Sequence, residues 1–190
     1  MRKILLVLVI CLPFVQASAQ ESNRDIKTGF RGGFLNSRIS TLENDSKQSF
    51  YFGLQMPIKY GTFFTLQPEV VYNKRGAKNI EIAGVTENQI SESHKVDLTV
   101  GYVDFTAISK LTYDRYNVHL GPGLAVLVHS SDKKAGIMEV TVNFGAGIQL
   151  SSNMGIEGRC IIGSGDISIS NQENKTTGSI SFQLGTYYNF

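Results

Sequence analysis

Three features of the sequence predict an all-β fold, an eight-stranded antiparallel up-and-down transmembrane β-barrel. About eight stretches alternate apolar residues with small or polar ones, which is the period of two of a β-strand with one apolar face. The connections between these stretches are alternately short and long, as they are in membrane barrels. The last stretch, 179–190, ends on the aromatic residue Phe190. The closing strand of such a barrel places aromatic residues in an interfacial girdle.

The N-terminal segment is expected to be a cleaved signal peptide, residues 1–19, followed by the barrel domain, residues 20–190. Arg2 and Lys3 precede an apolar run over residues 4–15, and the small residues 17–19 form a cleavage pattern. The run is shorter than the roughly 20 apolar residues of a membrane-spanning helix. Export followed by barrel insertion predicts the outer membrane of a Gram-negative bacterium as the location, with outer-membrane lipid as a partner.

Charge and cysteine content exclude several classes of function. The chain has 18 basic and 16 acidic residues, and loss of Arg2 and Lys3 leaves the mature chain about neutral. This balance argues against nucleic acid as a partner. Only Cys160 remains after cleavage, so neither an internal disulfide nor a cysteine-based zinc site is expected. By its parity Cys160 faces lipid as a small apolar side chain, and we expect no cofactor.

The first half of the chain predicts four strands. They cover 25–35, 50–58, 63–74 and 95–110. A polar loop over 36–48, a tight turn over 59–62 and a long polar loop over 75–94 connect them. In the fourth strand the apolar face shifts by one residue, from Val100 and Tyr102 to Val103 and Phe105, which predicts a β-bulge.

The second half predicts four more strands with the same alternation. They cover 117–129, 139–150, 155–163 and 179–190, with turns at 112–115 and 151–153 and loops at 130–136 and 164–177. Pro68 and Pro122 fall inside predicted strands, where each removes a ladder hydrogen bond. We expect local bulges at both prolines.

Several short segments resemble one known family. Residues 65–78, TLQPEVVYNKRGAK, are similar to the PorT-like outer-membrane β-barrel proteins, which pair an LQPE-x-x-Y-x-x-x-G strand with an early Gly-Gly strand, here 29–35. Residues 102–110, residues 117–127 and the C-terminal Phe190 agree with this resemblance. It covers nearly the whole mature chain and implies an eight-stranded outer-membrane barrel. It implies no particular activity.

Charged residues recur on the polar face of the predicted strands. By parity this face carries Lys27, Arg31, Glu69, Asp104, Glu139, Glu157 and Arg159. An eight-stranded barrel is just wide enough for side chains to fill it, and buried charges are costly unless they are paired. We therefore expect a salt-bridged plug in the lumen. The alternative is an ion path through it.

The loop ends offer two further hypotheses. His94 and His129 lie at strand ends, near Ser130 and Asp132, and His119 points inward. A hydrolase at the rim would need a base within reach of its nucleophile, but only adjacency in the sequence supports one, so we expect no enzyme. Loop 75–94 is the longest predicted loop and the candidate surface for an envelope protein partner, because loops on a rigid scaffold commonly carry binding.

The alternation alone leaves a second architecture open. A soluble, secreted, lipocalin-like barrel would turn its apolar face inward around an apolar ligand. Aromatic residues at strand ends favour the membrane barrel, namely Tyr60, Phe63, Tyr113, Tyr116, Tyr188 and Phe190. We further expect Tyr188 and Phe190, in the last strand, to form the signal read by the barrel-assembly machinery.

Overall fold

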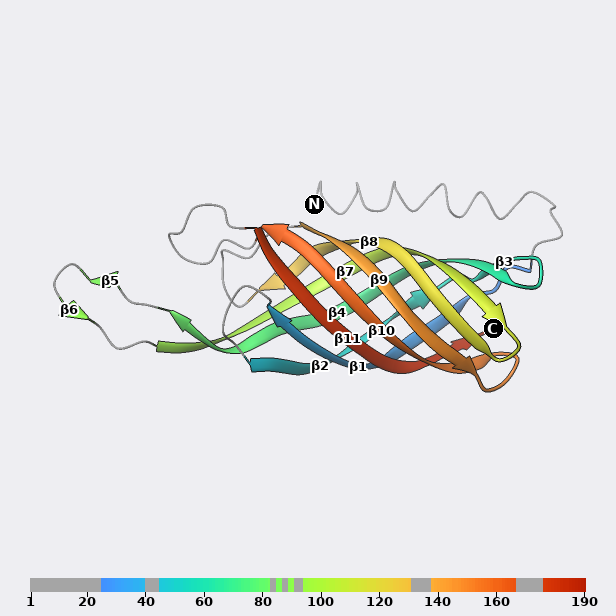
Figure 1. Ribbon diagram of the computed structural model, residues 1–190, viewed down its shortest axis with the longest axis horizontal. Helices are drawn as coiled ribbons and strands as arrows, with labels where there is room; N and C mark the ends of the chain where they lie inside the picture. The colour runs from blue at the N-terminus through green and yellow to red at the C-terminus, as the bar shows by residue number, and fades with distance from the viewer. Residues whose placement is uncertain are drawn as a thin grey trace.

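The structure is a computed structural model, which describes residues 25–39, 45–82, 85–86, 89–90, 94–130, 138–166 and 176–190. Eight long strands wind into an antiparallel barrel (Figure 1). They are β1 (Gly29–Ile39), β2 (Asp45–Gln55), β4 (Phe64–Ile82), β7 (His94–Tyr113), β8 (Tyr116–Ser130), β9 (Met138–Gln149), β10 (Met154–Asp166) and β11 (Thr176–Asn189). No helix in this described part is long and apolar enough to span a membrane.

The barrel closes because both ends of the sheet find partners. The first strand, β1, pairs with the last, β11, and β2 pairs with β4, so the ladder runs around the whole circumference. The short strand β3 (Ile58–Tyr60) continues β2 along β4, and β5 (Val85–Thr86) pairs with β6 (Gln89–Ile90) beyond the barrel. The predicted eight-stranded up-and-down barrel is confirmed.

The two ends of the barrel differ in the length of their connections. Short connections near residues 61–63, 114–115 and 150–153 lie at one end, which we call the turn end, together with the C-terminus (Figure 1). At the other end, the loop end, strands β1, β4, β8 and β10 end at Ile39, Ile82, Ser130 and Asp166, and the strands that follow them begin. Gly61 has φ of 76°, a left-handed conformation that suits glycine in the β3–β4 turn.

Three predicted loops proved too long. Strand pairing reaches Ile39 and resumes at Asp45, although the pattern predicts a loop over 36–48. Strand β4 runs to Ile82 and β7 starts at His94, so residues 75–82 of the predicted loop 75–94 belong to a hairpin. Likewise β10 and β11 extend into the predicted loop 164–177. Polar strand extensions give no apolar alternation, and cross-strand hydrogen bonds decide their conformation instead.

The predicted bulge in the fourth strand is misplaced. The register of the β7–β8 pair shifts between Gly101 and Tyr102, but the extra residue is Val128 on β8. Strand β7 keeps one parity, so Val100 and Tyr102 lie buried inside the barrel with Asp104. Apolar residues on both faces produced the false frame shift.

The strand prolines are accommodated without bulges of their own. The β4–β7 register is continuous through Pro68, which lies opposite the break between β2 and β3, and its carbonyl accepts a 2.9 Å hydrogen bond from the Met56 amide. Pro122 pairs in register with Val142, and the β7–β8 pairing skips the proline without changing register. The expected bulges are therefore wrong, and each proline lies beside a gap in one ladder.

The outer surface of the barrel is apolar. Large apolar side chains with at least a third of their surface exposed cover most strands, among them Phe34, Phe52, Leu54, Val70, Leu120, Val140, Val142, Phe144, Ile162, Phe182 and Leu184. All six aromatic residues predicted at strand ends are exposed, and all lie at the turn end. Cys160 lies half-buried on this outer face, between the inward residues Arg159 and Ile161. The soluble ligand-carrier alternative is wrong, because the apolar face points outward.

Candidate functional site

The described lumen buries four cations and four carboxylates. They are Arg31, Arg75, Lys110, Arg159, Glu69, Asp104, Glu139 and Glu157. They divide into two clusters along the barrel. The turn-side cluster contains Arg31, Glu69, Lys110, Glu157 and Arg159, and the loop-side cluster contains Arg75, Asp104 and Glu139.

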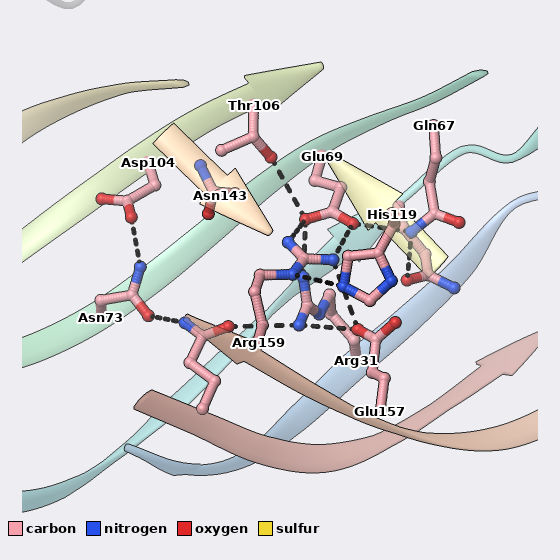
Figure 2. A network of polar contacts seen from close by, with 12 residues as sticks. Arg31, Gln67, Glu69, Asn73, Asp104, Thr106, His119, Asn143, Glu157 and Arg159 are labelled. Atoms are coloured by element: carbon pink, nitrogen blue, oxygen red, sulfur yellow. Dashed lines mark hydrogen bonds and ion pairs between the residues drawn. The ribbon is translucent and has the colours of Figure 1, made fainter. Parts of the chain in front are cut away.

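Glu69 on β4 is the centre of the turn-side cluster (Figure 2). Its Oε2 accepts from Arg31 Nη1 at 2.7 Å and from Arg159 Nη1 at 2.6 Å, while Oε1 accepts from Arg159 Nη2 at 3.0 Å. The second guanidinium nitrogen of Arg31 lies 2.7 Å from Glu157 Oε1. Two arginines from opposite parts of the chain thus share two carboxylates, which satisfies the requirement that buried charges be paired.

Neutral side chains complete the coordination of this cluster. Gln67 Nε2 donates to Glu69 Oε1 at 2.6 Å, and the Thr106 hydroxyl donates to Oε2 at 3.2 Å. Arg159 Nε donates to His119 Nε2 at 3.3 Å, so that ring nitrogen is an acceptor. The other nitrogen, Nδ1, lies 3.3 Å from the side-chain oxygen Oδ1 of Asn117 and carries the proton. His119 is therefore neutral here, and it orients an arginine.

Lys110 is the least constrained member of the turn-side cluster. Its Nζ lies 3.7 Å from Glu157 Oε2, beyond hydrogen-bond distance, and 4.9 Å from the centre of the Tyr187 ring. Glu157 Oε2 in turn has no hydrogen-bond partner among the described residues.

The loop-side cluster places Arg75 between two carboxylates. Arg75 Nη1 lies 2.7 Å from Glu139 Oε2, and Nη2 donates to Asp104 Oδ2. The Ser179 hydroxyl donates to the other Glu139 oxygen. An amide relay joins this cluster to the turn side (Figure 2): Asn73 donates to Asp104, Gln183 donates to Asn73, and Arg31 donates to Gln183. The polar network is continuous along the lumen.

Tyrosine rings and glycines shape the space around the charges. Three of the four cations lie over a lumen tyrosine, and the pairs are Arg31 with Tyr51, Arg75 with Tyr102 and Lys110 with Tyr187. Inward glycines leave room for these groups. A Cβ built on Gly185 would lie 2.4 Å from the Tyr51 hydroxyl and 2.3 Å from the Gly32 carbonyl oxygen. The lumen is therefore tightly filled at this level.

The structure brings six of the seven predicted lumen charges into the network. Lys27 stays apart, because it lies at the turn end, where Nζ donates to Asn153 Oδ1 at 3.4 Å. Sequence reasoning missed Arg75, which it assigned to a loop, and Lys110. Extending the inward parity of β4 and β7 along the full length of each strand would have identified both residues as inward. It also missed the apolar lumen residues Leu35 and Ile108, which no charge pattern marks.

The rim residues offered for catalysis do not form a described site. The His129 side chain is exposed. Asp132 lies outside the described residues, as do the side chains of His94 and Ser130. Among the described residues, no group of three His, Cys, Asp or Glu side chains could hold a metal ion.

Comparisons with known proteins find matches only among solved structures. No protein-family model matches the chain, and no curated protein matches it in sequence. Neisserial surface protein A is similar over 89% of this chain and 100% of its own, with a TM-score of 0.53 and 14% identity. Ail, the attachment invasion locus protein of Yersinia pestis, is similar over 87% of this chain and 99% of its own, with a TM-score of 0.51 and 15% identity.

These similarities agree with the arrangement of the side chains. The apolar surface faces outward, the charges are paired inside, and the closed ladder of the described strands leaves no strand edge in the apolar belt. The chain has the fold of an eight-stranded transmembrane β-barrel.

Proposed function

We propose that the protein is a non-conducting barrel of the Gram-negative outer membrane, which serves a structural, adhesive or envelope-assembly accessory role through its loop end. The observation that carries this proposal is the ion-paired network that fills the lumen. We propose no enzymatic reaction.

The geometry of the two clusters supports the plug. The side chains of Arg31, Glu69 and Glu157 have no solvent-accessible surface, and Arg159 has 1%. An ion crossing the lumen would have to displace arginines that are held by charge-assisted hydrogen bonds on both sides. A steady path through a closed, eight-stranded lumen is therefore unfavourable.

The β4–β7 hairpin is the best candidate for an interaction surface. Strand β4 has 19 residues and β7 has 20, whereas crossing a bilayer takes about 9–11 residues. The surplus projects beyond the other strands and carries the small β5–β6 pair at its tip (Figure 1). A long paired hairpin presents a partner with a more ordered surface than a loop of the same length would.

Three finer assignments accompany this proposal. The short-segment resemblance supports membership of the PorT-like family. Residues 1–19 act as the signal peptide that leads to export. Tyr188 and Phe190 serve as the recognition signal for barrel assembly, and their rings lie against Phe30 with centroids 5.8 Å and 5.9 Å away. The adhesive variant draws support from the name of the Yersinia protein, which describes attachment.

Two measurements test the barrel and its plug. The mature chain, refolded in detergent, should migrate differently on a denaturing gel with and without boiling, because a closed barrel resists the detergent. In a planar bilayer it should give no large, steady conductance. Such a conductance from the wild-type protein would refute the plug, and a water-soluble chain without a gel shift would refute the membrane barrel.

A hairpin replacement tests the interaction surface. Ile82 pairs with His94, so residues 83–93 can be replaced by a two-residue Asn-Gly turn that keeps the ladder in register. The variant should retain its gel shift and lose the envelope partner that the wild-type protein captures after cross-linking in intact cells. The matched control replaces residues 131–137 at the same end. Equal capture by both variants would show that the hairpin is not the partner surface.

A further inference from the structure

A small pocket opens inside the lumen at the turn end, below the turn-side cluster. It holds about 60 Å³. Lysine and neutral polar side chains dominate its wall, including Lys27, Lys110, Thr112, Asn117 and Gln149. No carboxylate lies in the described lining, although three lysines do. A single water needs about 10–15 Å³ of such space, so the pocket has room for several waters or one compact ion.

The buried lysine of this pocket lacks the hydrogen-bond partners that such a group requires. Lys110 is 6% exposed, and no described group accepts a hydrogen bond from its ammonium. An ammonium has three donors and no acceptor, and here it has only a 3.7 Å ion contact with Glu157 and the face of the Tyr187 ring. Its neighbour Glu157 Oε2 is also without a donor at hydrogen-bond distance. The protein therefore leaves a polar, charged wall that a bound molecule can complete.

The balance of charge around the pocket selects the sign of that molecule. The turn-side cluster contains three cations and two carboxylates, whereas the loop-side cluster contains one cation and two carboxylates. Both carboxylates of the turn-side cluster are already engaged by Arg31 and Arg159. Lys110, at the pocket wall, has the longest ion contact of the cluster, 3.7 Å from Glu157, so it is the cation whose charge is least compensated. Charge and hydrogen-bond donors both favour an anion with several acceptor oxygens.

We propose that this pocket is a binding site for a compact oxyanion, a phosphate or carboxylate group of a small solute that enters from the turn end. Lys110 is the cationic anchor, and Asn117, Gln149 and Thr112 supply neutral donors around it. The lining side chains face the lumen and not the apolar belt, so the ligand is a solute and not a lipid headgroup. The proposal goes beyond the closed plug, which lies deeper in the barrel.

The test titrates inorganic phosphate, and separately acetate, into the ¹⁵N-labelled mature chain folded in a detergent with an uncharged headgroup. Ionic strength is held constant with sodium chloride. Saturable amide shifts should appear at Thr112, Asn117 and Gln149 with at least one of the two anions. Lys110→Gln removes a charge-assisted hydrogen bond and should weaken binding about tenfold or more. Lys74→Gln makes the same charge change in the loop half of β4 and should leave binding unchanged.

Three results would overturn the site. They are the absence of saturable shifts with either anion, equal binding by the wild-type and Lys110→Gln proteins, and equal shifts when chloride replaces the oxyanion. Where Lys110→Gln fails the gel-shift test of folding, Lys27→Gln at the pocket mouth takes its place and should weaken binding several-fold. Binding that persists unchanged in a folded Lys27→Gln protein would then refute the site.

Discussion

Replacing Glu69 by alanine tests whether the lumen charges hold the barrel together as a paired network. Glu69 accepts five hydrogen bonds, two of them from Arg159. After the replacement Arg31 keeps Glu157 at 2.7 Å, but Arg159 retains only its hydrogen bond to the neutral His119 and a 3.5 Å contact with Glu157. One buried guanidinium therefore loses its main partner, and the cluster gains one more uncompensated positive charge.

The expected cost follows from the burial of the pair. Breaking a buried ion pair by removing one partner costs about 3–5 kcal/mol, because the remaining charge is left without compensation. An exposed pair contributes about 0–1 kcal/mol. The same barrel offers such a pair, Lys59 and Asp25, whose side chains are about half exposed and 3.3 Å apart. Asp25→Ala is therefore the matched control and should cost less than about 1 kcal/mol.

Unfolding can be followed by the gel shift or by circular dichroism as urea increases, since the chain has no tryptophan to report by fluorescence. Glu69→Ala should lower the free energy of unfolding by about 3–5 kcal/mol. It should not open a steady pore in a planar bilayer, because the other side chains of the plug remain. A loss no larger than that of Asp25→Ala would refute the paired network as a source of stability. Steady conductance from Glu69→Ala would refute the reasoning about the plug.

Three further predictions test other parts of the barrel. Gly185→Ala would place its methyl group against the Tyr51 hydroxyl and the neighbouring backbone, so it should destabilise the barrel by about 1–3 kcal/mol in urea titrations. Gly158→Ala is its control, because there the nearest atom is 4.0 Å from the added carbon; equal costs would contradict the tight lumen. Arg75→Met should destabilise the barrel by about 3–5 kcal/mol, and adding Glu139→Gln should restore part of that loss, since one unpaired carboxylate is removed. A double variant no more stable than the single one would contradict the pairing. Val142→Arg, at an exposed position in the apolar belt, should cost about 2–4 kcal/mol in lipid vesicles; no cost there would show that this face does not meet lipid.

The parity of the strands carried the sequence-based prediction of the inner and outer faces. Where one face meets lipid and the other the lumen, a side-chain period of two assigns each residue without knowledge of the neighbouring strands. Parity groups Glu69, Glu157 and Arg159 on one face, and the prediction of a membrane barrel places that face in the interior, where all three are buried. The same reasoning failed at Val100 and Tyr102, because an apolar residue that fills the lumen gives the same signal as one that faces lipid.

The parity of the strands could not predict how long each strand is or which charged residues pair. After Lys74 the residues of β4 carry no continuous apolar period, and pairing with β7 extends this strand as far as Ile82, which lies opposite His94. The bulge at Val128 on β8 shifts the register of the β7–β8 pair. It does not change the alternation of inward and outward residues along β7.

The amino-acid pattern is enough to predict an all-β chain of alternating strands with charged residues on one face, because that information is local and repeats every two residues. Which charges meet depends on the folded barrel. Glu69 joins Arg31 and Arg159, which lie 38 and 90 residues away, while Lys27 stays at the mouth and Lys110 faces a pocket without a hydrogen-bond partner. Those partnerships depend on the register and closure of the barrel, which bring together side chains from distant strands.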